Sequence, residues 1–417
     1  MKYVTCRWII TGLDPQPVSD GVIMIDKRGR ITEVAPLAQV DVPAEAEVVD
    51  WSDYAVLPGM IDSHTHLALG YTRTRGLVDQ LQTPLPLIAI EGFISLQRDL
   101  QSGVTTLRAL GDADGLEVIV RDAIARKEIP GPRLLASVEI RPTHGTGLTS
   151  RGTDGPDAIR KRIREGIHQG VDVVKLFASN TKPGSDEKAY RRGDLTTVAA
   201  YTQAEICVAV EEAHRAGVRV AVHALGGDPM RWALEAGADT IEHANLLEAD
   251  EIDLFLETGA YLSDPNLQLF FDEATGFQSR ETWARLPKWW RDKVKATADK
   301  TREVHREALR QGVKFALGTD SNHSHLWREA KHFVEVIGAS PVEAIHAVTR
   351  NCADALGIEE DVGTLQTGKV ADLIAVRGNP LVDIGCLSQT AGVMLAGEIV
   401  EHEFLSKSGQ RPLHARR

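Results

Sequence analysis

The sequence predicts an α/β protein: a (β/α)8 TIM barrel with a small β-sandwich domain built from both chain ends. Two observations lead to this fold class. Between residues 58 and 356, short apolar runs alternate with longer helical patterns, which is typical of parallel strands covered by helices. At both chain ends, short β-branched runs are separated by turns instead. We therefore expect a composite β-sandwich from residues 1–57 and 357–417, and a barrel from residues 58–356.

The two chain ends share one pattern. Residues 21–25 and 30–34 are apolar runs, and the four residues between them, Asp-Lys-Arg-Gly, have the composition of a hairpin turn. Near the C-terminus, residues 371–376 and 392–395 are similar short runs. Because the first and last regions share this character, we expect them to pack together as one small β-domain beside the barrel.

Eight candidate strands define the barrel. They span residues 59–63, 104–110, 133–138, 171–176, 218–223, 240–243, 260–263 and 313–318. The helices expected between them include 202–216, which begins at a Thr202 cap, and 289–311. An open doubly wound sheet is the structural alternative. No GxGxxG follows the first strand, which argues against a dinucleotide-binding fold.

Composition limits the classes of function. The 417 residues are 43% hydrophobic and 25% charged, as in ordinary globular proteins. A net charge of −12 argues against binding to nucleic acid or to an anionic membrane. We expect neither a transmembrane helix nor a signal peptide, because no long apolar run is present. Four scattered cysteines without a CxxC pair predict reduced thiols, and hence a cytoplasmic enzyme.

Chemistry-bearing residues follow several of the candidate strands, where TIM barrels place their catalytic groups. The first strand ends at His64-Thr65-His66, and residues i and i+2 of a strand face the same way, so both imidazoles should point into the barrel mouth. The fourth strand ends with Lys175 among apolar neighbours. This lysine either extends to the rim or reacts with carbon dioxide to form a metal-bridging carbamate.

Three more strands are followed or ended by a side chain that could bind a metal ion: His223, His243 and Asp320. Each alone could be a core histidine or a helix-capping aspartate. Together the strand ends carry four histidines, one lysine and one aspartate, a set that suits zinc or a similar divalent ion. Six ligands are too many for one tetrahedral site with an open position. They fit two metals that share a lysine carbamate and a hydroxide, which can polarise and attack a carbonyl group.

Several motifs resemble those of the amidohydrolase superfamily. Residues 58–67, PGMIDSHTHL, resemble its first-strand signature, and residues 318–320, GTD, resemble its eighth-strand signature. Residues 363–373 resemble its C-terminal β-domain. The chain is most similar to the imidazolonepropionase-related branch, which contains Xaa-Pro dipeptidases, peptidases that release a C-terminal amino acid, and hydrolases of aryl amides and ureas. Lys175, residues 223–224 (HA) and residues 241–243 (IEH) match the pattern of this branch.

The resemblance implies a role for each candidate ligand. His64, His66 and Asp320 would hold the more buried metal ion, and His223 with His243 would hold the outer one. The cofactors would then be two divalent ions, with zinc as the ion that suits these donors.

The resemblance also implies the bridging and catalytic groups. Lys175, carboxylated to N6-carboxylysine, would bridge the two ions. Asp320 would take the proton of the bridging hydroxide during its attack and deliver that proton to the leaving nitrogen. In the loop that follows the third strand, His144 would contact the substrate, although a simple exposed histidine is the alternative.

Two features bear on the substrate. Many dipeptidases of this branch have a tyrosine two residues after the fifth-strand histidine, whereas this chain has Leu225, which cannot donate a hydrogen bond. The long connection at residues 265–288, with Trp283 inside it and Trp289 and Trp290 after it, could form an aromatic substrate loop. Alternatively, these aromatic side chains pack against the barrel flank or another subunit.

The sequence therefore predicts a binuclear metal-dependent amidohydrolase that cleaves the amide bond of a dipeptide or an N-acyl amino acid. The alternative is a hydrolase of aryl amides, ureas or carbamates. Deamination is disfavoured because Gly226 occupies the position of the deaminase glutamate. Imidazolone ring opening is disfavoured because the enzymes of that group lack the bridging lysine, whereas this chain has Lys175. A non-catalytic assembly protein is a remote alternative, since all six ligands are in place. The expected partners are a small-molecule substrate and, from the resemblance, further copies of this chain.

Overall fold

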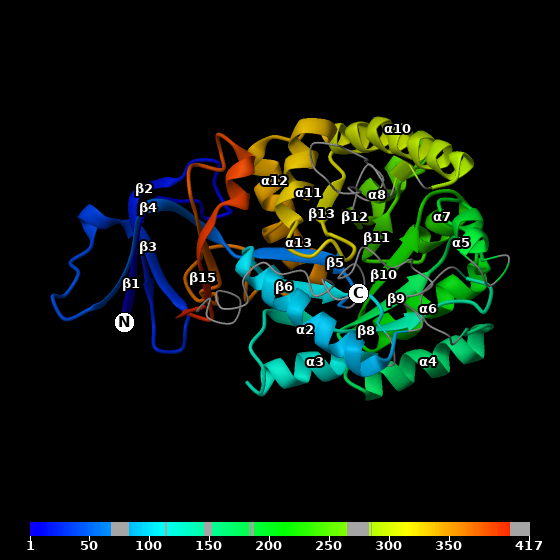
Figure 1. The fold of residues 1–417 in the computed structure, drawn as a ribbon, viewed down its shortest axis with the longest axis horizontal. Coiled ribbons are helices and arrows are strands. Elements are labelled where there is room, and N and C mark those ends of the chain that lie inside the picture. Colours follow the sequence, from blue (N-terminus) through cyan, green and yellow to red (C-terminus); the bar gives the residue numbers. More distant parts are fainter. Residues whose placement is uncertain are drawn as a thin grey trace, which may run out of the picture.

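The computed structural model describes residues 1–67, 83–112, 115–145, 152–182, 184, 187–264, 283–284 and 286–400. A β-sheet formed by the first and last parts of the chain lies at one end of the molecule (Figure 1). The rest is a larger α/β body, in which helices lie around a set of parallel strands. None of the helices described is both long and apolar enough to cross a membrane.

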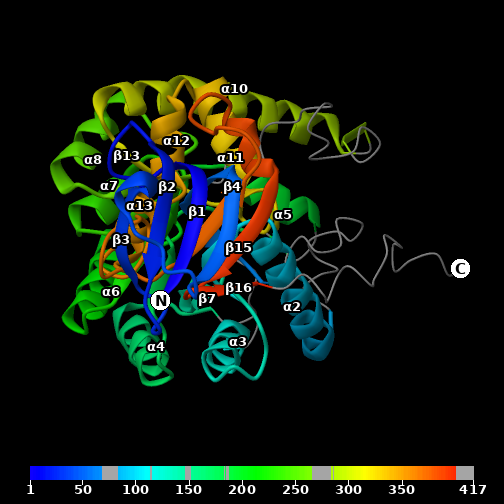
Figure 2. The same ribbon diagram turned by 90° about the vertical axis from the view of Figure 1, so that its left-hand side faces the viewer.

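The sheet at the end of the molecule combines both chain termini. Its seven strands run in the order β16-β15-β14-β4-β1-β2-β3. Their bounds are β1 (Lys2–Ile9), β2 (Val18–Ile25), β3 (Ile31–Pro36), β4 (Glu47–Pro58), β14 (Leu373–Val376), β15 (Thr390–Leu395) and β16 (Glu398–Ile399). Figure 2 shows the blue N-terminal strands and the red C-terminal strands side by side.

This region forms one sheet in the described residues, where the sequence predicted a two-sheet sandwich. The reason is the length of β4, which spans 12 residues. It pairs in parallel with β1 and antiparallel with β14, so a single strand joins the two chain ends edge to edge. The predicted hairpin of β2 and β3 is present, and Asp26 holds its turn by accepting bonds from the backbone N–H groups of Arg28 and Arg30.

Among the residues that the structure describes, the α/β body contains nine parallel strands. They are β5 (Met60–Thr65), β6 (Val104–Ala109), β7 (Arg133–Leu135), β8 (Ser137–Ile140), β9 (Val173–Phe177), β10 (Arg219–Ala224), β11 (Thr240–His243), β12 (Tyr261–Asp264) and β13 (Lys314–Leu317). One hydrogen-bonded ladder contains β5-β6-β7, and a second runs β13-β12-β11-β10-β9-β8. These strands match the eight predicted ones, except that the third is divided.

The division of the third strand has a local cause at Ala136. Its carbonyl oxygen accepts bonds from Asp172 N and Val173 N, and its own N–H donates to the Asp172 carboxylate. The backbone of Ala136 therefore turns away from β6 and toward β9. The two ladders are also separate between β5 and β13. There, Ser63 Oγ on β5 donates to the Leu317 carbonyl of β13 at 2.9 Å. The arrangement is TIM-barrel-like, with two separate ladders.

Helices cover the outside of these strands (Figure 1). They are α2 (Leu85–Gln101), α3 (Leu116–Ala125), α4 (Pro156–His168), α5 (Glu187–Gly193), α6 (Gln203–Arg215), α7 (Asp228–Glu235), α8 (Ile252–Thr258), α10 (Lys288–Gln311), α11 (Leu326–His332), α12 (Pro341–Ala347) and α13 (Arg350–Leu356). As predicted, α6 begins at Thr202, which forms a reciprocal capping box with Glu205. Apolar faces of these helices and strands form one large buried core, with smaller clusters beside it at α13, at α10 and between β9 and β10.

Candidate metal centre

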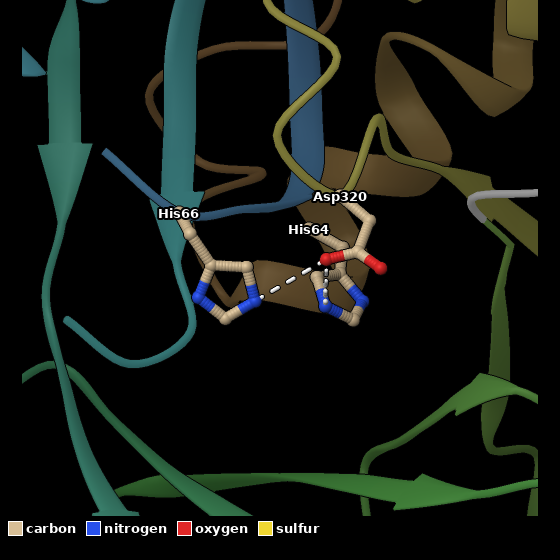
Figure 3. A group of neighbouring side chains, drawn as sticks. All are labelled: His64, His66 and Asp320. Carbon is tan, nitrogen blue, oxygen red and sulfur yellow. Dashed lines mark ion pairs between the residues drawn. The ribbon is translucent and has the colours of Figure 1, made fainter. Parts of the chain in front are cut away.

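Three side chains converge at the C-terminal ends of β5 and β13. Nε2 of His64 lies 3.6 Å from Oδ1 of Asp320, and Nε2 of His66 lies 3.3 Å from the same oxygen (Figure 3). The three ligand atoms all lie within 4.8 Å of one another. Both histidines are buried: His64 lies in β5, all of whose residues are buried, and His66 follows that strand directly. The structure thus brings together the three residues expected to hold the more buried ion.

The backbone around this group is held by Asp62. Its carboxylate accepts bonds from His64 N at 3.1 Å, from Thr319 N at 3.0 Å and from Thr319 Oγ1 at 2.6 Å. Asp320 N also donates to the His64 carbonyl at 2.7 Å. Asp320 and Ser321 have φ values of 44° and 77°, so the chain turns sharply after β13. These contacts direct the Asp320 carboxylate back toward β5.

Hydrogen bonds on the far side of each imidazole decide which nitrogen faces the centre. Nδ1 of His64 lies 2.7 Å from Oε2 of Glu242, and Nδ1 of His66 lies 2.6 Å from the Gly111 carbonyl. Carboxylates and carbonyls only accept, so each Nδ1 carries the hydrogen and each Nε2 keeps a lone pair. A neutral imidazole of this tautomer turns its Nε2 lone pair toward the Asp320 carboxylate. Without an ion there, burial lowers the pKa of His66, but Asp320 outweighs burial and raises this pKa above its usual value. A cation between these acceptors satisfies all of them, so the donor set fits a metal ion.

Lys175 lies beside this group. It is 1% exposed, and its Nζ lies 3.4 Å from Nε2 of His64. The side chain is therefore buried at the centre and does not reach the rim. Burial lowers the pKa of the Lys175 amine to about 8. An amine of this kind is neutral more often than an ordinary lysine at neutral pH, and the neutral form is the one that can react with carbon dioxide.

The remaining two histidines complete a continuous cluster of imidazoles. The ring centres of His223 and His243 are 4.7 Å apart, and those of His64 and His243 are 5.0 Å apart. Burial lowers the pKa of His243 to about 3 and that of His64 to about 4, and it holds the pKa of His223 well below its usual value. Neutral imidazoles are the form that binds metals. All six expected ligands thus lie in one buried region.

A sharp turn brings His243 into this cluster. In a regular strand, Glu242 and His243 would face opposite sides. His243 has a φ of 77°, and Ala244 N donates to the Glu242 carbonyl at 3.1 Å across it, which is the pattern of a γ-turn. Helix α10 supports the turn, since Thr301 Oγ1 donates to the Asn245 carbonyl at 3.0 Å and His305 Nε2 lies 3.1 Å from the Ala244 carbonyl.

The sequence model of the Amidohydrolase family matches residues 55–400. The chain belongs to this amidohydrolase family. Its homologues in this family are hydrolases that act on carbon–nitrogen bonds. The match begins within β4 and ends after β16, so it includes the parallel strands and all six candidate ligands.

Three comparisons place this amidohydrolase among known proteins. It is 30% identical to ochratoxinase of Aspergillus niger over 244 residues, 58% of this chain, and spans about half (48%) of that relative's length. It is 28% identical to the imidazolonepropionase of Rhizorhabdus wittichii over 392 residues, covering 85% of this chain and 88% of the relative. The crystal structure of a Xaa-Pro dipeptidase with bound methionine in the active site has a TM-score of 0.82 and 27% identity, over 96% of this chain and 99% of that one.

Sequence reasoning assigned no role to three buried polar residues of the amidohydrolase centre: Arg108, Asn180 and Glu242. Arg108 and Glu242 are at most 1% exposed and form an ion pair of 2.9 Å. Asn180 is fully buried, and its amide nitrogen lies 2.8 Å from His223 Nε2. Arg108 and Glu242 carry a usable signal, because a charge inside an apolar strand must be paired when it is buried. Asn180 follows β9 in an irregular segment and carries no such signal.

The expected substrate contacts are only partly described. His144 lies exposed in the loop after β8, where its carbonyl accepts a bond from Lys182 N. Of the loop at 265–288, residues 265–282 and 285 lie outside the described residues. Trp283 and Trp290 belong to a buried cluster along α10, whereas Trp289 is 39% exposed. Trp283 therefore packs against α10, and Trp290 lies on the buried face of that helix.

Proposed function

We propose that this amidohydrolase uses two divalent metal ions, zinc being the ion that suits the donors, to hydrolyse the amide bond of a dipeptide or an N-acyl amino acid. The observation that carries the proposal is the position of Lys175. Its buried amine lies 3.4 Å from a ligand nitrogen of His64. A carbamate formed on this amine would offer oxygen ligands to both ions, of which His64, His66 and Asp320 would hold one and His223 and His243 the other.

The protein groups then have distinct tasks. When bound, the two ions would polarise the scissile carbonyl and make water nucleophilic at neutral pH. Asp320 accepts the proton of the attacking water and returns it to the leaving nitrogen, acting as general base and then general acid. Burial alone raises the pKa of Asp320, but the neighbouring His64 and His66 imidazoles hold it well below its usual value, so the carboxylate is ionised and able to accept.

The substrate class rests on separate support. The similarity to a Xaa-Pro dipeptidase structure favours a peptide-like substrate with a free carboxylate. A second candidate, an aryl amide, urea or carbamate, is favoured by Leu225, whose buried side chain offers no hydrogen bond beside His223. His144 is proposed to contact either kind of substrate.

The remaining expectations belong to the same proposal. Residues 58–356 would form a closed (β/α)8 barrel. Residues 1–57 and 357–417 would together form a second domain. The enzyme would work in the cytoplasm on a small molecule, as a homo-oligomer. The four cysteines are free thiols in the structure, in keeping with a reducing compartment.

A hydrolysis screen tests the proposal. Zinc-loaded protein supplied with bicarbonate is assayed on one panel of dipeptides and N-acyl amino acids, and on a second panel of aryl amides, ureas and carbamates. A chelator-stripped sample is the control for each. Release of free amino acid that disappears with the chelator is the expected result. Activity on the second panel alone would favour the alternative substrate class, and hydrolysis unaffected by chelation would contradict the metal mechanism.

A further inference from the structure

The candidate metal centre is open to solvent at the ends of three strands. The side chain of Asp320, after β13, is 18% exposed. Phe177, the last residue of β9, and His243, the last residue of β11, are half-buried. Lys175 and His64, by contrast, are each 1% exposed. A substrate has to approach the centre from the side that solvent reaches, so Phe177 lies at the entrance.

Two expected metal-binding residues hold the ring of Phe177. Lys175 and Phe177 are two residues apart in β9, so their side chains project to the same side of the strand. Nζ of Lys175 lies 5.3 Å from the centre of the Phe177 ring. On the neighbouring strand β10, His223 is in register with Phe177, and the two rings stack with their centres 5.1 Å apart and their planes at 29°.

This stacking is compatible with a metal ion on His223. An imidazole binds a metal ion through a nitrogen lone pair, which lies in the plane of the ring. Phe177 covers the face of the His223 ring, so an ion in the ring plane does not displace it. The exposed part of the Phe177 ring is then an apolar surface next to the outer ion.

The proposed reaction indicates which part of the substrate meets this surface. Asp320 returns the proton to the leaving nitrogen, so that nitrogen lies on the side of β13. In the ladder β13-β12-β11-β10-β9-β8, β9 is separated from β13 by three strands, so the two strands approach the centre from different sides. The acyl group leaves the scissile carbon in a different direction from the nitrogen. It therefore extends toward β9 and Phe177.

We infer that Phe177 is a specificity-determining residue, which packs against the acyl group of the substrate and selects an apolar, flat group there. The inference rests on the proposed hydrolysis and names the acyl side of its substrate. Aromatic rings bury a large apolar surface and interact favourably with a second ring in an offset or edge-on arrangement. A charged acyl group would lose water at the Phe177 ring and gain no hydrogen bond in return.

Two variants and one control separate this role from a purely structural one. Phe177→Ala removes the ring. Phe177→Leu keeps an apolar cover over Lys175 and His223 but removes the flat face. Tyr54→Ala is the matched control: Tyr54 is also a half-buried aromatic residue with a cation near its ring, Cζ of Arg377 at 5.3 Å, but it lies on β4 in the terminal sheet.

Three quantities are measured on the zinc-loaded full chain with bicarbonate. They are metal content, kcat/KM for the N-benzoyl and N-acetyl derivatives of one amino acid, and affinity for benzoate and acetate, the acids that these substrates release. The wild type should prefer the benzoyl substrate and bind benzoate more tightly than acetate. Tyr54→Ala should behave as the wild type does.

The variants of Phe177 should lose this preference selectively. Phe177→Ala should lower kcat/KM for the benzoyl substrate by about 10–100-fold, because it removes an apolar contact made by that acyl group. Its affinity for benzoate should fall too, whereas the acetyl substrate, acetate and the number of bound ions should be unaffected. Phe177→Leu should show a smaller loss of the same kind.

Equal losses for both acyl groups in a variant that holds two ions would overturn the inference, because Phe177 would then only position His223. An unchanged benzoyl preference in the variants would overturn it as well. If Phe177→Ala loses an ion, Phe177→Leu decides by the same comparison. A wild type that binds two ions and prefers benzoate through Phe177, yet hydrolyses nothing, would instead contradict the proposed function.

Discussion

Oε2 of Glu242 lies 2.7 Å from Nδ1 of His64, while Oε1 of the same carboxylate lies 2.9 Å from Nη2 of Arg108. All three side chains are at most 1% exposed. Burial alone raises the pKa of Glu242, but Arg108 and His64 outweigh it and hold the pKa well below its usual value. A permanently charged carboxylate therefore orients a ligand imidazole, the arrangement that commonly strengthens metal binding by histidine.

Glu242→Gln should weaken binding of the more buried ion by about 10–100-fold, because the neutral amide orients His64 poorly and leaves Arg108 without its counter-charge. The affinity is measured by competition with a chelator of known strength. Glu212→Gln is the control: Glu212 is also buried and pairs with an arginine, Arg164, at 2.7 Å, but this pair joins α6 to α4 and lies outside the centre. Equal affinity in Glu242→Gln and wild type would show that this carboxylate has no part in metal binding.

Replacement of Asp320 by asparagine should lower kcat by about 10²–10⁴-fold, because the amide cannot accept and return a proton. Asparagine keeps a ligand oxygen at the same position, so both ions should remain measurable in the variant. Metal content and kcat are determined on the same preparation. Near wild-type turnover by a fully loaded Asp320→Asn enzyme would disprove the proton-transfer role.

Recovery of metal binding by chelator-stripped protein should depend on pH, because it requires a carbamate at Lys175. Carbamate formation needs the neutral amine, and the pKa of this amine is about 8. Below pH 8 the protonated form prevails and reacts slowly, so recovery of metal binding by stripped protein should be faster at pH 8.5 than at pH 6.5. Dissolved carbon dioxide is held constant between samples.

The controls for this experiment are a carbon dioxide-free sample and Lys175→Ala. The alanine variant should fail to retain the metal pair at any pH and should partly recover with added short carboxylates. Recovery of the wild type that is independent of both pH and carbon dioxide, or two tightly bound ions in Lys175→Ala, would exclude a bridging carbamate.

Much of the centre follows from strand periodicity alone. The alternation of β5, continued one residue past its end, places His64 and His66 on one side, and Lys175 lies in the apolar strand β9, so both positions were predictable. The turn at His243 was not predictable, because its φ of 77°, uncommon for a residue other than glycine, is stabilised by contacts with α10. Asn180 was missed for the same reason: its position depends on long-range backbone pairing, which no local pattern encodes.

The fold, like the site, was predictable from the sequence only in part. Eight apolar runs predicted the parallel strands, because such strands are buried on both faces. The break at Ala136 was not foreseeable, since it depends on Asp172, which is 36 residues away in the chain. Nor could a single sheet be distinguished from a sandwich, because the pairing partners of the long strand β4 are not visible in its own sequence.

The turn at His243 should be weakened by Thr301→Val. Valine keeps the shape of threonine but removes the hydroxyl that contacts the Asn245 carbonyl at 3.0 Å and the Thr297 carbonyl at 2.8 Å, which should lower the free energy of unfolding by about 1 kcal/mol and weaken binding of the outer ion. Chemical denaturation and metal titration measure the two effects. Thr258→Val, which removes a bond to the Leu254 carbonyl within α8 and a 3.4 Å bond from Ala260 N, is the control. Unchanged metal affinity in Thr301→Val would mean that α10 does not support this ligand.

Stability should depend on pH through His323. Its Nδ1 lies 2.6 Å from Oδ2 of Asp99. Burial by itself lowers the pKa of His323, but Asp99 outweighs it, and the pKa is raised above the ordinary 6.5. A raised folded-state pKa stabilises the protein fully below pH 6.5, and this contribution is lost as the pH rises through the folded value.

The measurement is the melting temperature of metal-free protein from pH 6 to pH 9, for wild type and His323→Gln. The difference between the two should be large at pH 6 and shrink as the pH rises. A difference that stays constant or grows with pH would contradict a protonated His323 in the folded state.

The central claim is that two ions, joined through Lys175, perform the hydrolysis. Its most direct test is an activity titration, in which chelator-stripped protein with bicarbonate receives zinc in fractions of an equivalent while bound metal and amide hydrolysis are followed together. The account predicts activity that reaches its maximum at two bound ions per chain and is abolished in Lys175→Ala. Full activity at one bound ion, or without any, would contradict it.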